Sequence, residues 1–248
     1  MDQSPPLLIK RAKLKRMVNA LLLALALIAG MYALDAQQHT EELPAETNIA
    51  TTEKTNDAAL QQYQNASEAL NALLVKGRAP KTGYSRDQFG NGWEGTNSCN
   101  TRNQILQRDL QNVQLGDGCT VLSGTLNDPY TGQIIQFIRG QDTSDKIQID
   151  HVVALSDAWQ KGAQQLVPEL RRQLANDPLN LLAVDGSANQ NKSDGDSATW
   201  LPPNKPFRCT YVARQISVKL KYTLWVTAAE KTAMQNILKT CPDQQLII

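Results

Sequence analysis

Histidine is nearly absent from this sequence. The 248 residues contain two, His39 and His151, which excludes most histidine-rich metal sites. The chain also lacks a strongly basic arm, and its formal net charge of +1 argues against a histone-like binder of nucleic acid. None of the four cysteines belongs to a Cys-x-x-Cys pair, so the short ligand spacing that is typical of structural zinc sites is missing.

The small net charge is the sum of three unlike segments. Residues 1–34 hold five Lys or Arg and one Asp, whereas residues 35–75 hold one Lys and seven Asp or Glu. Residues 76–248 hold 19 Lys or Arg and 16 Asp or Glu. Only this last, modestly basic part favours contact with a polyanion.

Residues 1–34 have the composition of a signal peptide or a signal anchor. Five basic residues between Lys10 and Arg16 precede the apolar run 18–34. A helix over that run is about 25 Å long, the lower limit for crossing a bilayer. The basic flank keeps the N-terminus cytoplasmic, so the rest of the chain is expected outside the cytoplasmic membrane. Leu34 stands just before the possible cleavage point, at a position where signal peptidase requires a small residue. A signal anchor is therefore favoured over a cleaved signal peptide.

The rest of the chain divides into a linker, a helix and one domain. Residues 35–56 are acidic, rich in Thr and free of Phe, Trp and Tyr, which predicts a flexible linker that includes His39. Residues 57–75 place apolar side chains three and four positions apart, as in an amphipathic helix that Asn56 or Asp57 can cap.

The domain over residues 76–248 is predicted to be α+β, because its strands and helices do not alternate regularly. Apolar periodicity predicts strands over 120–126, 133–139, 146–150 and 179–184. It predicts helices over 103–110, 154–165, 168–175, 210–222 and 228–239.

All four cysteines follow the apolar run and therefore lie in the exported part, where disulfides form. Of the three possible connectivities we favour Cys99–Cys119 with Cys209–Cys241, since each pair joins neighbouring segments. Each such bond stabilises the fold by about 3–4 kcal/mol in the chain-entropy model. A four-cysteine zinc site is the alternative.

The stretch around His151 carries the chemistry. Asp150 places a carboxylate beside an imidazole at the end of a strand, and Asn180 opens the next apolar strand. Asn189 follows nine residues later, in a short helix predicted to begin near Ser187. Asp150 and Asn189 can hold one divalent cation, Mg²⁺ in the first place and Mn²⁺ or Ca²⁺ as alternatives, because hard cations prefer oxygen ligands. His151 can then take a proton from an attacking water.

His151, Asn180 and Asn189 match the three letters of the HNH motif, and the chain resembles secreted HNH endonucleases of Gram-positive bacteria. The tail Asn189-x-x-Lys192-Ser-Asp is similar to the HNH domain of CRISPR effector nucleases. Gln190 departs from the pattern, which has a basic residue there. The resemblance covers residues 76–240 and includes the blocks 77–80, 84–86, 101–103, 128–132, 150–155 and 200–203. It implies a ββα-metal core with added strands and helices.

The resemblance further implies an exported, metal-dependent endonuclease that acts on nucleic acid, DNA before RNA, without a small-molecule cofactor. His151 is the expected general base, and Asn180 is the second catalytic residue, with an orienting role on the loop that carries His151. Asp150 and Asn189 are the expected metal ligands. The expected phosphate-binding residues are Lys192 and Arg86. The alternative is a catalytically silent surface module that binds nucleic acid or a partner in the cell envelope.

Each of these residues also has a structural interpretation. Asp150 can cap the turn after its strand, and Asn189 can serve as a helix-start residue. Trp159 and Trp200 are predicted to belong to the core rather than to stack on bases.

Overall fold

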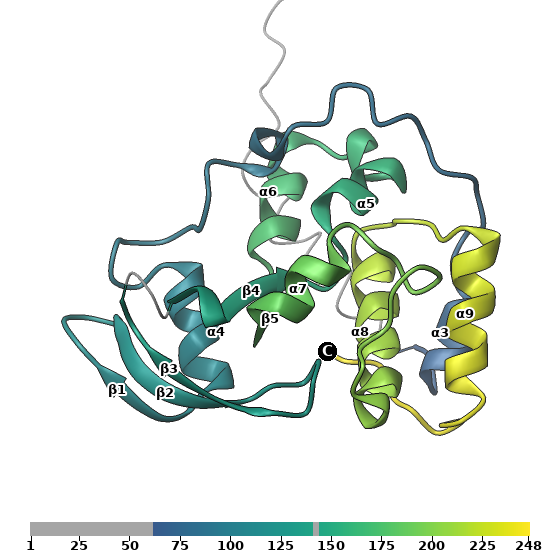
Figure 1. Ribbon diagram of the computed structural model, residues 1–248. Coiled ribbons are helices and arrows are strands. Elements are labelled where there is room, and N and C mark those ends of the chain that lie inside the picture. Colours follow the sequence, from purple (N-terminus) through teal and green to yellow (C-terminus); the bar gives the residue numbers. More distant parts are fainter. Residues whose placement is uncertain (1–61, 141–143) are drawn as a thin grey trace, which may run out of the picture. The chain divides into compact units, whose positions relative to one another are not determined.

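The computed structural model describes residues 62–140 and 144–248 (Figure 1). The apolar run 18–34, the linker and the first residues of the predicted helix 57–75 lie outside these described residues. Within the described residues, no helix is long and apolar enough to cross a membrane. The chain divides into two units, 1–51 and 52–248, and the described residues belong to the second.

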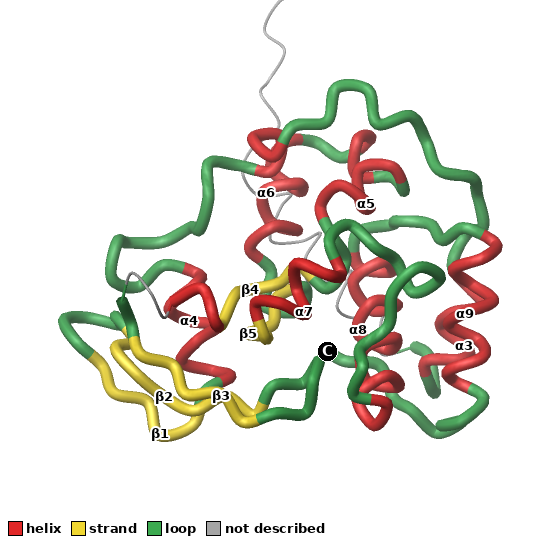
Figure 2. Tube along the Cα trace, viewed as in Figure 1, coloured by secondary structure: helices red, strands yellow, loops and turns green. Residues whose placement is uncertain are grey.

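Two small antiparallel sheets organise this unit (Figure 2). The first contains β1 (Gln111–Leu115), β2 (Val121–Asn127) and β3 (Ile134–Ile138), in that order. The second pairs β4 (Ile147–His151) with β5 (Leu181–Asp185), in a register that sets His151 opposite Leu181. The four predicted strands are confirmed within two residues. Strand β1 was missed because its sequence, QNVQL, lacks a clear apolar alternation.

Helix α4 lies against the three-stranded sheet, and the other helices lie around and beyond the two-stranded sheet, which confirms the predicted α+β class. Five follow the predicted ranges closely: α4 (Thr101–Asp109), α6 (Pro168–Asn176), α7 (Gly186–Lys192), α8 (Arg208–Lys221) and α9 (Ala228–Leu238). The helix predicted over 154–165 is interrupted at Gly162, whose φ of +126° departs from helical geometry. It forms α5 (Leu155–Gln160) and the 3-10 turn η3 (Ala163–Gln165) instead.

The helix predicted over 57–75 is shorter in the described part of the chain. Helix α3 covers Ala66–Ala72, and its N-cap is Asn65, whose side chain accepts from the Glu68 amide. The chain leaves the helix after Ala72 because the backbone there pairs with Val226 instead. The Val226 amide donates to the Leu74 carbonyl, and the Lys76 amide donates to the Val226 carbonyl, both at 3.0 Å.

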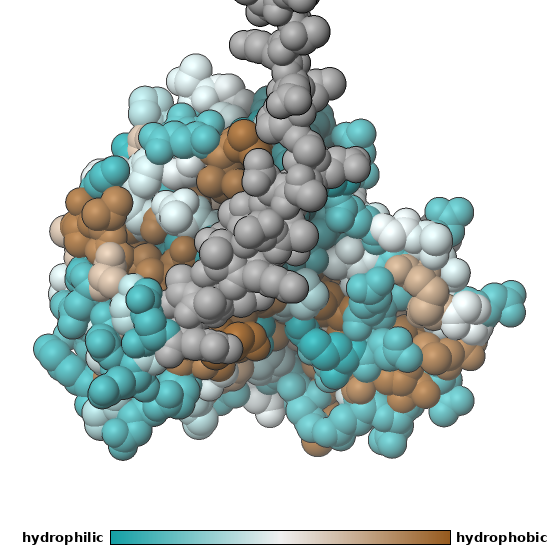
Figure 3. Space-filling model, turned by 180° about the vertical axis from the view of Figure 1, so that it is seen from behind, coloured by the Kyte–Doolittle hydropathy of each residue, from teal (hydrophilic) through white to brown (hydrophobic). Residues whose placement is uncertain are grey.

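Three apolar clusters form the core. The first joins α3, α8 and α9, the second joins α5, α6 and the end of α8, and the third places α4 against both sheets. Trp159 and Trp200 pack in or against these clusters, as predicted. Apolar surface remains on the three-stranded sheet, visible at the lower right of Figure 3. Its exposed members are Leu115, Leu122, Ile134 and Ile138.

Both predicted disulfides are confirmed. Cys99–Cys119 ties the start of α4 to the β1–β2 turn, and Cys209–Cys241 ties the start of α8 to the end of α9. No free cysteine is left for metal binding, since these four are all that the chain contains. The alternative of a four-cysteine zinc site is therefore wrong.

Candidate active site

The candidate site lies on a strand–strand–helix unit formed by β4, β5 and α7. Strand β4 ends at His151, β5 pairs with it, and α7 packs against both strands. Asp185 caps α7 by accepting from the Ala188 amide, which starts the helix directly after β5. Asp150, His151 and Asn189 therefore come together at one cleft, as the sequence predicts.

The His151 imidazole is held in one orientation. Its Nε2 lies 2.9 Å from the Ala175 carbonyl, which can only accept, so Nε2 carries the proton and Nδ1 keeps its lone pair. The Trp93 ring stacks on the imidazole, with 5.6 Å between centroids and 14° between planes. Only 7% of His151 is exposed, and this burial lowers its pKa to about 3. Near neutral pH the side chain is therefore a neutral acceptor.

Asn180 supports the loop after His151 and does not reach the cleft. Its side chain is fully buried, and Oδ1 accepts from the Val153 amide at 2.8 Å. Nδ2 donates to the carbonyls of Val153 and Leu174 at 3.3 and 3.2 Å. All these bonds go to backbone, so the geometry gives Asn180 the orienting role and leaves no group for contact with substrate.

Lys192 is an internal counterion of Asp150. Its Nζ donates to Asp150 Oδ1 at 2.8 Å and to the His151 carbonyl at 2.9 Å. Its side chain has no exposed surface. The prediction that Lys192 contacts phosphate is therefore wrong, because the inner face of α7 directs the ammonium into the protein. Tyr130 donates its hydroxyl to Asp150 Oδ2, and burial raises the pKa of Asp150 while Lys192 opposes that shift.

The oxygen atoms of this site fit a weakly held hard cation. Each carboxylate oxygen has two lone-pair directions, so Asp150 keeps acceptor capacity after its bonds to Lys192 and Tyr130. Asn189 Nδ2 donates to Gln148 Oε1 at 2.8 Å, which leaves Asn189 Oδ1 as a further acceptor. Among the residues that the structure describes, no three His, Cys, Asp or Glu gather as a metal site. One carboxylate and one amide suit Mg²⁺, which keeps most of its water, better than zinc.

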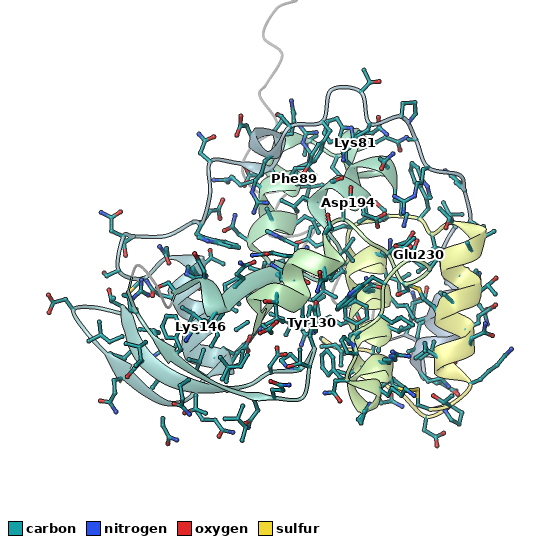
Figure 4. All side chains as sticks on the ribbon, in the orientation of Figure 1. Lys81, Phe89, Tyr130, Lys146, Asp194 and Glu230 are labelled. Carbon is teal, nitrogen blue, oxygen red and sulfur yellow. A yellow bond between two sulfur atoms is a disulfide. The ribbon has the colours of Figure 1, made fainter. Side chains whose placement is uncertain are left out.

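The cleft beside His151 measures about 580 Å³ and is bordered by cations. Arg86, on the 3-10 turn η1 (Arg86–Phe89), is exposed and lines it, consistent with the predicted contact to phosphate. Lys81 and Arg102 line it as well. Asp194 partly offsets this charge, because its Oδ2 lies 3.3 Å from Lys81 Nζ (Figure 4).

Sequence reasoning did not assign Lys81, Arg102, Tyr84 and Trp93 to the site. Arg102 lies on α4 and donates to the Ile147 carbonyl at 3.3 Å, next to the start of β4. Burial lowers its pKa. The shared blocks 84–86 and 101–103 were the available signal for Tyr84 and Arg102. No pattern singled out Lys81 or Trp93, since only the fold brings residues 81–93 next to His151.

Comparison with known proteins matches residues 100–237 to the family model "GmrSD restriction endonucleases, C-terminal domain". The chain is also 39% identical over 178 residues to an uncharacterized secreted protein of the fungus Arthroderma benhamiae, an alignment that covers 71% of this chain and 84% of the relative. That relative is fungal, so the predicted link to Gram-positive proteins stays a prediction. No solved structure matches significantly. The family match spans more than half of the chain and all of β4, β5 and α7, and the chain therefore belongs to the family of the GmrSD restriction endonuclease C-terminal domain.

Proposed function

We propose that this protein is an exported, divalent-metal-dependent endonuclease of the HNH type, which hydrolyses phosphodiester bonds of nucleic acid. The observation that carries the proposal is the state of His151, a neutral imidazole with its Nδ1 lone pair free, in a cleft that also holds Asp150 and Asn189. The name of the family supports nuclease chemistry, and the name of the fungal relative supports secretion.

His151 acts as the general base in this proposal. Nδ1 accepts a proton from water, the water oxygen attacks phosphorus, and the bond from phosphorus to the leaving oxygen breaks. The hydrogen bond from Nε2 to the Ala175 carbonyl and the stacking of Trp93 fix the imidazole in one orientation. The imidazole therefore needs little reorganisation before it accepts the proton. An anionic phosphate near the ring raises its pKa from the low value of the free protein, which strengthens it as a base.

Asp150 and Asn189 would hold the cation, with water and substrate phosphate as the remaining ligands. When bound, the cation supplies charge stabilisation for the crowded oxygens on phosphorus. Arg86 lies at the same cleft and binds a phosphate of the substrate. Lys192 and Tyr130 keep the Asp150 carboxylate in place from the protein side.

The site implies a nucleic-acid substrate, with DNA expected before RNA, and no small-molecule cofactor. We infer export on the basic flank and apolar run of the N-terminus, with membrane anchoring through residues 18–34 if they are not removed. The second candidate function is a silent module that binds nucleic acid without cleaving it. The buried Asp150–Lys192 pair favours it, since a paired carboxylate attracts a metal ion less strongly.

Cleavage of labelled DNA and RNA by the purified full chain, with and without a chelator, tests this proposal. We expect cleavage that the chelator abolishes and that added Mg²⁺ or Mn²⁺ restores. Asp150→Ala should remove activity at ordinary metal concentration, whereas Lys239→Gln, an exposed change at the end of α9, should not. Binding without cleavage under every metal condition would support the silent module instead.

Asn189→Asp tests the predicted metal ligands separately. The change adds a negative charge beside Asp150, so we expect tighter binding of Mg²⁺ by calorimetry, without a necessary gain in turnover. Unchanged Mg²⁺ affinity in both Asn189→Asp and Asp150→Ala would place the cation elsewhere.

A further inference from the structure

A second, smaller cavity adjoins the His151 cleft. It measures about 200 Å³, and its walls are Phe89, Trp93, Leu155 and the backbone of Gly90 and Gly92. Arg86 and His151 line it as well, and these two residues, together with Trp93 and Leu155, also line the larger cleft. The two spaces therefore lie next to each other at His151.

The size and lining of this cavity suit one aromatic ring. A water molecule takes about 30 Å³, and an apolar cavity of about 150 Å³ accepts benzene, so this cavity is too large for one water and sufficient for a single ring system. It is smaller than the roughly 300–1,000 Å³ of sites for drug-sized ligands and cofactors. Gly92 adopts a φ of +112°, which disfavours other residues at this edge of the cavity.

The walls of the cavity are held in place before any ligand arrives. Arg171 on α6 donates to the Gln88 carbonyl at 2.9 Å and to Gln88 Oε1 at 3.1 Å. The Glu94 amide donates to Asn176 Oδ1 at 2.9 Å. Phe89, labelled in Figure 4, is almost fully buried. Its ring packs against that of Trp159, with 6.2 Å between centroids. A pocket of this rigidity loses little conformational entropy on binding.

We propose that this cavity binds one base of an unpaired nucleotide whose phosphate lies at Arg86 and His151. This inference rests on the proposed nuclease function and names its substrate class, single-stranded or locally unpaired nucleic acid. A base stacked and paired in a duplex cannot enter a walled cavity, whereas an unstacked base can lie against an aromatic side chain. The segment that forms most of the cavity, residues 86–93, precedes the part of the chain that the family model matches, which begins at residue 100.

Binding of fluorescent ten-nucleotide strands to the full chain, measured by anisotropy in a chelator, tests the pocket without requiring cleavage. We expect the single strand to bind more tightly than its duplex. We also expect an abasic strand of equal length to bind about 5- to 100-fold more weakly than the base-bearing one, the range that base–aromatic stacking supplies. Trp93→Ala should remove most of this difference, Trp93→Phe should restore part of it, and Lys239→Gln should retain it.

The outcomes separate this inference from the proposed function. Equal binding of base-bearing and abasic strands by the unaltered chain, or equal binding of duplex and single strand, would overturn the pocket even if the protein cleaves nucleic acid. Absence of cleavage with every metal would overturn the nuclease proposal, whereas a preference for bases that depends on Trp93 would still establish the pocket. The measurement on the unaltered chain decides the question even if Trp93→Ala does not fold.

Discussion

At the scale of single residues, the site depends on which polar groups are buried and what each one contacts. The sequence supplied candidate residues for the site, but it could not distinguish a cation that faces solvent from one that faces the core. Arg86 and Lys192 were predicted to have the same role, yet Arg86 borders the cleft and Lys192 is enclosed with Asp150. Only tertiary packing of α7 decides that difference.

Substitution of Arg86 and of Lys192 should therefore affect different properties, binding for Arg86 and stability for Lys192. Arg86→Gln should weaken binding of nucleic acid and reduce the slope of log Kd against log salt concentration by about one, because one phosphate contact is lost. Lys192→Met leaves Asp150 buried without its counterion, and should lower the free energy of unfolding by about 3–5 kcal/mol. Anisotropy at several salt concentrations and urea unfolding measure the two effects. A salt slope that changes with Lys192→Met alone would reverse these assignments.

The low pKa of His151 predicts a pH-dependent stability. The folded state holds the imidazole at a pKa of about 3, against 6.5 for an ordinary histidine, so between these values the unfolded chain binds more protons. The stabilisation is complete above pH 6.5 and is lost as the pH falls towards 3, by at most about 1.4 kcal/mol per pH unit.

Unfolding of the unaltered chain and of His151→Gln, compared from pH 7 to pH 4, measures this contribution. The difference between the two free energies should shrink as the pH falls, while the effects of carboxylates and of His39 cancel. A constant difference over this range would show that His151 has an ordinary pKa in the folded protein.

At the scale of elements, apolar periodicity predicted most strands and helices because their buried faces are continuous. This periodicity failed as a predictor where another segment of the chain takes the backbone hydrogen bonds of a helix. Val226 takes the hydrogen bonds that would extend α3 beyond Ala72, and no local pattern reports that pairing. The sequence predicted no helix or strand between Gly77 and Glu94, although this segment supplies cleft residues such as Arg86 and Trp93.

A buried network of charges holds several of these elements together. Lys161, the C-cap of α5, is fully buried, and its Nζ contacts Asp157, Asp196 and Glu230 at 2.6–2.8 Å. Lys219 on α8 also contacts Glu230, at 3.0 Å. The nearby carboxylates raise the pKa of Lys161 against the opposing effect of burial. The network thus joins α5, α8, α9 and the loop after α7.

Lys161→Met should lower the free energy of unfolding by about 3–5 kcal/mol, because three buried carboxylates lose a counterion. Urea unfolding measures the change, with Lys239→Gln as the exposed control at the end of α9. Adding Glu230→Leu to Lys161→Met should recover part of the loss, since one uncompensated charge is removed. A midpoint that Lys161→Met leaves unchanged would mean that the network contributes nothing to stability.

At the scale of the whole molecule, the fold brings residues as far apart in the sequence as Lys81 and Asp194 to a single cleft. The family match accounts for the core from residue 100 onward, and the preceding segment completes the walls around His151. The two disulfides fix α4 to the three-stranded sheet and α8 to α9, which suits a domain that works outside the cytoplasm. In the proposed reaction, His151 is the group that accepts a proton from water.

The most direct test of that role is the single-turnover cleavage rate of His151→Ala with Mg²⁺ present. We expect a loss of at least about 100-fold, the contribution of a positioned general base. Affinity for nucleic acid in a chelator and the circular dichroism spectrum should change little. A folded His151→Ala protein that cleaves at the rate of the unaltered chain would contradict the account.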